Sequence, residues 1–253
     1  MILHIPHSSI KFPNKDGFII SKDELSQEVL KLTDWYTDEL FESKNWESVK
    51  ADFSRIFCDT ERFSDNSKEV MFKYGMGVLY EKSDDGRPIR NVTEELRENI
   101  LTSYYWKHHS DLNKAVLREL KEFGQSLIID CHSFPDTPLK RDLNKILNRP
   151  DFNIGTDSFH TPKKLIDASI DFFKSKGFSL GVDEPYSGSI VPMNFYQKDK
   201  RVSSIMLEIN RKLYLEDKTN TKSKDFEEIK SVTQEFISLM NAVYYEDNYN
   251  KIF

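Results

Sequence analysis

The sequence predicts an α/β fold, on three observations. Residues 126–131 are built on the apolar run Leu-Ile-Ile, as expected for a strand that helices cover on both faces of a sheet. Segments with strand character alternate along the chain with segments of helical spacing, which is typical of an α/β domain. We find no internal repeat, linker or low-complexity tract, so we expect one domain over residues 1–253.

The first third of the chain predicts a strand, a helix and a long loop. We expect a strand at residues 2–6, which ends at a proline. Apolar residues at helical spacing predict a helix over 23–43. Residues 47–58 have the pattern of an extended segment. The polar segment 63–92 predicts a functional loop with some strand at 77–81, because loops of this length usually carry function or are disordered.

The middle of the chain predicts a long helix that leads into the central strand. Thr93 is a suitable first cap, and Gly124 is a suitable residue to end the helix after position 123. The central strand at 126–131 follows directly. After a loop rich in proline and polar residues, the segment 152–156 predicts a short strand that ends in a turn.

The last third predicts a helix, two strands and a final helix. Thr161 is expected to cap a helix whose first residue is Pro162, the order that such helices prefer. This helix should end near a lysine–glycine pair at 176–177. Strands are expected at 178–182 and 203–209, and an amphipathic helix at about 224–244.

The bulk composition excludes some classes of protein. The chain has 253 residues and a formal charge of −6, which disfavours a basic nucleic-acid binder or a cationic membrane-surface protein. Cys58 and Cys131 stand in apolar runs and are expected to be buried free thiols, which favours a reducing compartment. We recognise neither a membrane-spanning run nor a signal peptide, and therefore expect a cytoplasmic protein.

Polar side chains stand at the ends of three apolar runs. They are His7, His132 and Glu208. In open α/β sheets the ligand site lies outside the carboxyl ends of the strands. Two imidazoles and a carboxylate at one sheet edge suit a mononuclear zinc hydrolase. A glutamate within an apolar strand is costly unless it is paired or functional, and burial raises its pKa toward that of a general base. The alternative is a structural ion pair with Arg211 or another arginine.

The third metal ligand stays open at this point. Asp34 and Asp38 are expected one turn apart on the same face of the 23–43 helix, and either could bind a metal or simply face solvent. Asp59 and Glu61 are further alternatives from the segment that follows. His109 falls within a predicted helix and is expected to be structural unless it faces the site.

Arginines near the predicted loops favour an anionic substrate, because guanidinium groups bind carboxylates through two hydrogen bonds. The alternative is ordinary surface charge. A turn that contains glycine and serine, at 186–189, could contact the substrate. The arginines are Arg55, Arg62, Arg87, Arg90 and Arg211.

Eight short motifs, in order, resemble those of the N-formylglutamate amidohydrolase family, a relative of the zinc carboxypeptidases and aspartoacylases. They span residues 6 to about 214. The motifs are Pro6-His7-Ser8, Thr33-Asp34-Trp35 with Asp38-Glu39-Leu40-Phe41, Phe53-Ser54-Arg55 through Cys58-Asp59-Thr60-Glu61-Arg62, His109-Ser110-Asp111-Leu112, Asp130-Cys131-His132-Ser133, Asn153-Ile154-Gly155-Thr156, Tyr186-Ser187-Gly188 and Leu207-Glu208.

The resemblance implies a phosphorylase/hydrolase-like three-layer sandwich with a mixed central sheet, and one zinc ion. It implies that His7, Asp34 and His132 bind the zinc and that Glu208 is the general acid/base. The implied reaction is hydrolysis of N-formyl-L-glutamate, a small anionic N-acyl amino acid, to formate and glutamate, in histidine degradation. The implied substrate contacts are Arg55, Arg62, Arg211, Tyr186, Ser187 and Gly188.

Three departures from the family pattern leave the substrate open. Ser9 stands where the family usually has glycine, and Asp59-Thr60-Glu61-Arg62 stands for the usual Asp-Leu-Asn-Arg. The loop before Pro185 lacks the basic residue that the family pattern predicts. A hydrolase of another N-acyl amino acid, a peptide or a peptidoglycan amide is therefore an alternative. A non-catalytic binder of an anionic ligand is the second.

Overall fold

A computed structural model describes the backbone of residues 1–249 and the side chains of residues 1–245; residues 250–253, the end of the expected domain, lie outside this description. The strands are β1 (Ile2–Ile5), β2 (Glu47–Lys50), β3 (Ser126–Phe134), β4 (Phe152–Gly155), β5 (Leu180–Val182) and β6 (Val202–Asn210). The helices are α1 (Lys22–Leu32), α2 (Thr37–Leu40), α3 (Glu94–Ile100), α4 (Trp106–Phe123), α5 (Lys163–Ser175) and α6 (Phe226–Tyr249), with the short segments η1 (Val70–Tyr74), η2 (Leu101–Tyr105) and η3 (Arg211–Leu213).

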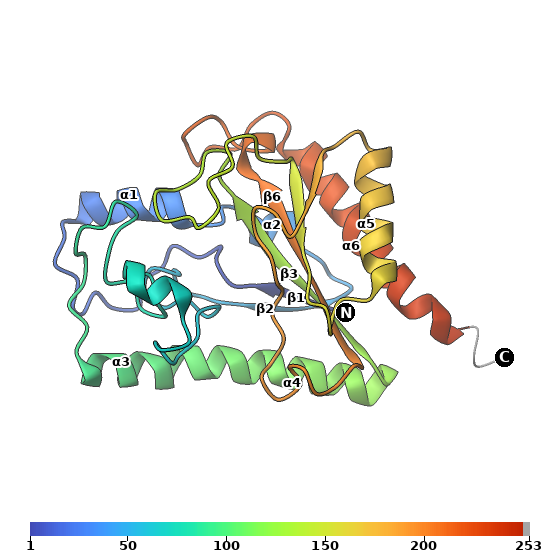
Figure 1. Ribbon diagram of the computed structural model, residues 1–253, viewed down its shortest axis with the longest axis horizontal. Helices are drawn as coiled ribbons and strands as arrows, with labels where there is room; N and C mark the ends of the chain where they lie inside the picture. Colours follow the sequence, from blue (N-terminus) through green and yellow to red (C-terminus); the bar gives the residue numbers. More distant parts are fainter. Residues whose placement is uncertain (250–253) are drawn as a thin grey trace.

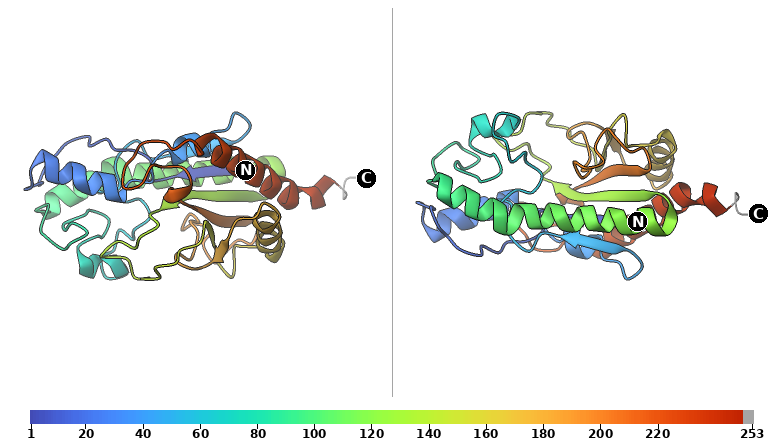
Figure 2. Two further views of the ribbon diagram at one scale, coloured as in Figure 1. Left: turned by 90° about the horizontal axis from the view of Figure 1, so that it is seen from above. Right: turned by 90° about the horizontal axis from the view of Figure 1, so that it is seen from below.

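The strands form one mixed sheet with the order β2-β1-β3-β6-β4-β5. All neighbouring pairs are parallel except β4 and β6, which are antiparallel. Helix α4 packs against β1, β2 and β3, whereas α6 packs against β3 and α5 packs against β4 and β5. Figure 1 shows α4 along one side of the sheet and α5 and α6 on the other, and the two views of Figure 2 show the same layers from above and below. The predicted α/β fold with a mixed sheet is confirmed.

Alternating side chains of the central strands explain the three layers. Ile128 of β3 joins a buried cluster with Val116 of α4. Its neighbour Ile129 joins a different cluster with Phe236 of α6. Successive residues of a strand point to opposite faces, so an apolar residue at each position buries both faces of the sheet. This is why the strand reads as a continuous apolar run.

The predicted helix over 23–43 is wrong, because the chain breaks between α1 and α2. Ser21 caps α1 through a capping box with Glu24. The helix ends before Asp34, whose amide donates to the carbonyl of His7 (3.1 Å). The carbonyl of Leu30, which a continuing helix would use, accepts the indole N–H of Trp35 instead (3.0 Å). Asp34 and Asp38 therefore do not share a helix face.

Other boundaries also differ from the predictions. Only Glu47–Lys50 of the expected extended segment is a strand, because the next residues coil into a turn in which the Phe57 and Cys58 amides both donate to Ser54. The expected strand at 77–81 is an isolated bridge at Tyr80. The remaining strands and helices fall within a few residues of their predicted places.

At α5 the expected cap is displaced by one residue. Pro162 occupies the cap position with no side-chain hydrogen bond. The Thr161 hydroxyl donates to the carbonyl of Ser204 in β6 (2.7 Å), so this side chain ties the start of α5 to the sheet. By contrast, Thr93 caps α3 and Gly124 ends α4 with positive φ, as predicted.

Cys58 and Cys131 are buried and not disulfide-bonded, as predicted. Among the described residues, no helix combines the length and apolar character that crossing a membrane requires.

Candidate functional site

The two predicted imidazoles meet at the carboxyl edge of the sheet. His7 follows β1 directly, and His132 lies near the end of the neighbouring strand β3. Their ring centroids are 5.1 Å apart, and both residues are almost fully buried. Glu208 is opposite His132 in the register of β3 and β6. Parallel pairing of adjacent strands is what brings these distant residues to one edge.

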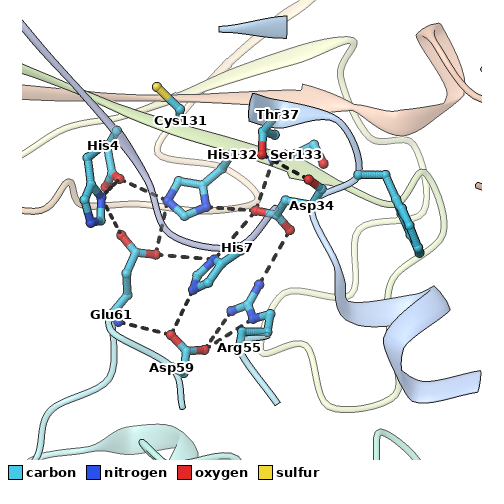
Figure 3. Close-up of polar contacts among 12 residues, drawn as sticks. His4, His7, Asp34, Thr37, Arg55, Asp59, Glu61, Cys131, His132 and Ser133 are labelled. Atoms are coloured by element: carbon cyan, nitrogen blue, oxygen red, sulfur yellow. Dashed lines mark hydrogen bonds and ion pairs between the residues drawn. The ribbon is translucent and has the colours of Figure 1, made fainter. Parts of the chain in front are cut away.

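Asp34 connects the two imidazoles. The turn after α1 places one of its oxygens, Oδ2, 3.0 Å from Nδ1 of His132 and 3.6 Å from Nδ1 of His7. The other oxygen, Oδ1, lies 3.0 Å from the guanidinium of Arg211 and 3.6 Å from that of Arg55. Burial alone would raise the pKa of Asp34, but the two neighbouring imidazoles and the charge of Arg55 hold it well below its ordinary value. Figure 3 shows Asp34 with its contacts to His7, His132 and Arg55.

Asp59 holds the far side of the His7 ring. Its Oδ1 lies 2.9 Å from Nε2 of His7. Its Oδ2 accepts hydrogen bonds from Arg55 (3.0 Å) and from the Tyr80 hydroxyl (2.8 Å). Asp59 is therefore a buried orienting partner of His7, and it faces the ring nitrogen opposite to the one that faces Asp34.

The hydrogen bonds determine which ring nitrogens are free. Nε2 of His7 donates to Asp59, and its Nδ1 has no hydrogen-bond partner. Nε2 of His132 lies 3.1 Å from both Asp130 and Glu61 and donates there. In a neutral ring this leaves the lone pair on Nδ1, which lies 3.0 Å from Asp34. A lone pair that faces a carboxylate needs a proton or a metal cation between them.

Two imidazole nitrogens and one carboxylate oxygen thus converge as possible ligands. The donor atoms of His7, Asp34 and His132 lie within 4.8 Å of one another. Nitrogen donors with one carboxylate are a suitable set for zinc. Without a cation, the neighbouring carboxylates favour protonation of the His132 ring. Burial would lower the pKa of His132, but Glu61 and Asp130 raise it well above its ordinary value. The residues present therefore fit a divalent cation.

A second group of possible donors lies beside the first. His4, Glu61 and Asp130 also place donor atoms within 4.8 Å of one another. Glu61 lies between the groups, with one oxygen 3.8 Å from Nδ1 of His4 and the other 3.7 Å from Nδ1 of His7. Of the alternatives to Asp34, Glu61 thus lies near both imidazoles, at 3.1 Å from His132 and 3.7 Å from His7, whereas Asp59 contacts only His7 of the two. Asp38 does not join them: its side chain is 38% exposed and pairs with Lys50.

Glu208 is a buried carboxyl without a salt bridge in the described part of the chain. It is 7% exposed, and its Oε2 has no hydrogen-bond partner. Burial raises the pKa of Glu208 to about 8. The alternative ion pair with Arg211 is absent from residues 1–245, where Arg211 instead binds Asp34 and Ser133.

One cavity of about 640 Å³ collects these groups. It is lined by His7, Asp34, His132 and Glu208 and by all six predicted substrate contacts, Arg55, Arg62, Arg211, Tyr186, Ser187 and Gly188. His109 also lines the cavity. It therefore faces the site, which is the case in which the sequence allows it a role beyond a structural one. Arg87 and Arg90 lie elsewhere: Arg87 pairs with Asp85 and Glu24 on the surface, and Arg90 binds the carbonyls of Asp16 and Phe57.

The three cavity arginines differ in what they already bind. Arg55 and Arg211 donate to Asp59, Asp34 and Ser133. Arg62 has no hydrogen bond at its buried Nε, and its nearest carboxylate is Asp59 at 3.8 Å. Arg62 therefore has the largest unused hydrogen-bonding capacity of the three.

Sequence reasoning missed several residues of the site. His4 precedes His7 by three residues and pairs with Asp130 in the register of β1 and β3. Strand alternation could have placed it on the same face as Asp130, but only the register makes them neighbours. Tyr80, which binds Asp59, and Arg141, which lines the cavity, come from loops and carry no signal in sequence spacing.

The fold and the site together define an α/β protein with a cavity of imidazoles, carboxylates and arginines at the carboxyl edge of a mixed sheet. The chain belongs to the N-formylglutamate amidohydrolase family, whose sequence model matches residues 1–215. It is therefore an enzyme that hydrolyses an amide.

Three relatives show how far the similarity extends. An N-formylglutamate deformylase of Pseudomonas putida is 21% identical over 228 residues, which cover 86% of this chain and 82% of that protein. The structure of N-formylglutamate amidohydrolase from Ralstonia eutropha JMP134 superposes with a TM-score of 0.84 at 21% identity, over 98% of this chain and 94% of that one. A gene product of Agrobacterium tumefaciens superposes with a TM-score of 0.64 at 16% identity, over 98% and 91%. At these identities the structural matches describe the fold.

Proposed function

We propose that this chain is a zinc-dependent deformylase that converts N-formyl-L-glutamate and water into formate and L-glutamate. One observation carries the proposal: a ring nitrogen of His7, a ring nitrogen of His132 and an oxygen of Asp34 lie within 4.8 Å of one another, in the cavity that also contains the unpaired carboxyl of Glu208. Family membership supports the reaction class, and the names of the relatives support the substrate.

The zinc ligands in this proposal are His7, Asp34 and His132. A zinc ion bound there would supply Lewis acidity, which polarises a carbonyl group and makes water more acidic. Asp59 would hold His7 and Asp130 would hold His132 through the opposite ring nitrogens, as outer partners of ligating histidines usually do.

Glu208 would move the proton that the reaction requires. Its carboxylate form would take a proton from water as the water oxygen attacks the formyl carbon. It would return that proton to the nitrogen of glutamate as the carbon–nitrogen bond breaks. Burial raises the pKa of this carboxyl, which is the direction that suits a group that accepts and then returns a proton near neutral pH.

The arginines would hold the carboxylates of the substrate. Arg62 has the free donor groups, and Arg55 and Arg211 add positive charge while they position Asp34. The turn formed by Tyr186, Ser187 and Gly188 would close the other side of the cavity. Guanidinium groups suit carboxylates because their planar donors match both oxygens. A role in cytoplasmic histidine degradation follows from this substrate and is part of the proposal.

The size of the cavity supports the alternative of a larger amide substrate. A cavity of about 640 Å³ falls within the range of sites for drug-sized ligands, so a group larger than formyl could enter. Glu61 also places a carboxylate beside the imidazoles. Its negative charge would repel a substrate carboxylate close to the metal. A larger N-acyl amino acid, a peptide or a peptidoglycan amide is therefore the second candidate.

A formate-release and amine-release assay distinguishes these candidates. Zinc-loaded protein is incubated with N-formyl-L-glutamate, N-formyl-L-aspartate, N-formyl-L-methionine, N-acetyl-L-glutamate and a muramoyl-peptide amide. The proposal expects the highest kcat/KM for N-formyl-L-glutamate. A higher value for a larger acyl group or a peptide would favour the alternative, and binding without turnover of any compound would favour a non-catalytic protein.

A further inference from the structure

A chain of buried hydrogen bonds runs behind the candidate zinc site. Nε2 of His108, in α4, lies 2.8 Å from Nε2 of His4, in β1. Nδ1 of His4 lies 2.8 Å from Oδ1 of Asp130, in β3. The same oxygen lies 3.1 Å from Nε2 of His132. Side chains of α4, β1 and β3 thus form one continuous path of contacts that ends at His132. Figure 3 shows part of this path.

All four side chains on this path are buried. Their exposed fractions are 6% for His108, 1% for His4, 2% for Asp130 and 4% for His132. Buried polar groups without partners are costly, and both ring nitrogens of His4 have one. None of the four residues forms an ion pair with lysine or arginine among the described side chains, so the imidazoles of His4 and His132 are the cationic or neutral partners nearest to the charge of Asp130.

The path restricts where hydrogens lie. Oδ1 of Asp130 is a carboxylate oxygen and only accepts, so it receives hydrogens from Nδ1 of His4 and Nε2 of His132. With Nε2 of His132 committed to this bond, its Nδ1 lone pair remains for the zinc site. If His4 did not donate, Oδ1 of Asp130 would lose one of its two donors and would hold the Nε2 hydrogen of His132 less firmly, in competition with Glu61 at 3.1 Å.

Asp130 also connects this path to the cavity wall. Its second oxygen, Oδ2, accepts the backbone amide of Ile190 (3.0 Å). Ile190 follows the turn that contains the predicted substrate contacts at 186–189. Asp130 is therefore bound on both oxygens, and its orientation affects the metal ligand and the turn together.

We propose that His4 and His108 are positioning residues that act through Asp130 to hold His132 with Nε2 protonated and Nδ1 free to bind the metal. This inference rests on the zinc site of the proposed function and extends it to two residues outside the ligand set. The second donor group of His4, Glu61 and Asp130 could instead bind a cation of its own. We favour positioning because Nδ1 of His4 lies at hydrogen-bond distance from Asp130, and 3.8 Å from Glu61.

Substitutions at His4 test the inference through zinc affinity. His4→Phe keeps a ring and removes both nitrogens, whereas His4→Asn keeps an N–H donor near the place of Nδ1. Loss of an outer partner of a metal-binding histidine typically weakens metal binding by about 10–100-fold. We expect that loss in His4→Phe, recovery of most of the affinity in His4→Asn, and a smaller loss in His108→Phe. The dissociation constant of zinc is measured by competition with a chromogenic chelator.

His160 provides a matched control. It is also a buried histidine, 1% exposed, with both ring nitrogens bound: one to the carbonyl of Val202 (2.7 Å) and one to the amide of Gln197 (2.8 Å). It has no contact with the path. His160→Phe should lower the free energy of unfolding and leave the zinc dissociation constant unchanged, which separates general destabilisation from positioning.

The tautomer of His132 gives a second readout. In zinc-loaded wild-type protein, nitrogen-15 NMR should show His132 protonated only at Nε2, and His4→Phe should shift or broaden that signal. Unchanged zinc affinity in His4→Phe would overturn the inference, as would an equal loss in His160→Phe. A second equivalent of zinc that wild type binds and His4→Phe does not would also overturn it, by making His4 a ligand. If wild-type protein binds zinc yet releases no formate, the proposed function fails and this test still decides the inference.

Discussion

Replacing Glu208 by glutamine removes an ionisable group from the buried end of β6 with little change in shape. The carboxyl is 7% exposed, its Oε2 has no hydrogen-bond partner, and burial raises its pKa from the ordinary 4.5 to about 8 in the metal-free protein. In the folded chain the group therefore keeps its proton at pH values at which the unfolded chain has lost it.

The sign and size of the effect on stability follow from proton linkage. Below the ordinary pKa both states are protonated, and Glu208 has no effect. As the pH rises from 4.5 toward 8, the unfolded state is stabilised by losing the proton, so the wild-type protein loses stability; above the folded pKa the loss is constant. At about 1.4 kcal/mol per pKa unit, the full loss is about 5 kcal/mol.

The measurement is urea unfolding of both proteins in the presence of a chelator. Between about pH 5.5 and about pH 8.5, the free energy of unfolding of Glu208→Gln minus that of wild type should rise by about 3 kcal/mol. Titrating groups that do not interact with Glu208 are common to both proteins and cancel in the difference. A difference that stays constant or falls over this range would refute the claim that the carboxyl is buried without a partner.

The same variant tests the catalytic role. With zinc bound to the same stoichiometry as in wild type, Glu208→Gln should lose about 10²–10⁴-fold in kcat, which is the usual contribution of a general acid/base. Full activity would remove Glu208 from the mechanism.

Three further predictions concern the ligand, the thiols and the core. Asp34→Asn should weaken zinc binding by more than the roughly 10–100-fold that loss of an outer partner costs. Asp38 is half-exposed and paired with Lys50, so Asp38→Asn should bind zinc as wild type does. Equal effects of the two substitutions in a chelator competition would contradict the assignment of Asp34 as a ligand. Burial raises the pKa of the Cys58 and Cys131 thiols, so a thiol reagent at about pH 8 should label both only in denaturant, because the thiolate is the reactive form. Phe152→Ala removes a fully buried ring and should lower the free energy of unfolding by about 3–5 kcal/mol in a urea titration; a loss below about 1 kcal/mol would contradict the packing.

The strand ends were predictable from the sequence because they combine two signals. Apolar runs mark buried strands, and polar residues at their ends mark the edge where α/β proteins place ligands. His7, His132 and Glu208 carry both signals, and the structure brings them into one cavity. The mixed sheet itself came from the family resemblance, since apolar patterning does not distinguish a parallel strand such as β3 from the antiparallel β4.

The position of Asp34 could not be predicted from helical periodicity. Apolar residues continue at helical spacing through the break, so the sequence predicts one helix where the structure has two. The break depends on tertiary contacts: the Asp34 amide binds His7, and the Trp35 indole takes the carbonyl of Leu30. The proposed choice of Asp34 over Asp38 therefore rests on the packing of this turn against His7, which helical spacing does not encode.

The roles of Glu61 and His4 depend on register and on loop geometry. Glu61 lies in a coiled segment and reaches His132 only because that segment folds over the sheet edge. His4 faces Asp130 because β1 and β3 pair with those two residues in register. Neither relation leaves a trace in the spacing of residues along one chain.

X-ray diffraction at the zinc absorption edge, on crystals of protein loaded with one equivalent of zinc, tests the central claim most directly. We expect a single anomalous peak in contact with Nδ1 of His7, Nδ1 of His132 and a carboxylate oxygen of Asp34. A peak bound by other residues, or no peak where these three side chains meet, would contradict the proposed metal centre.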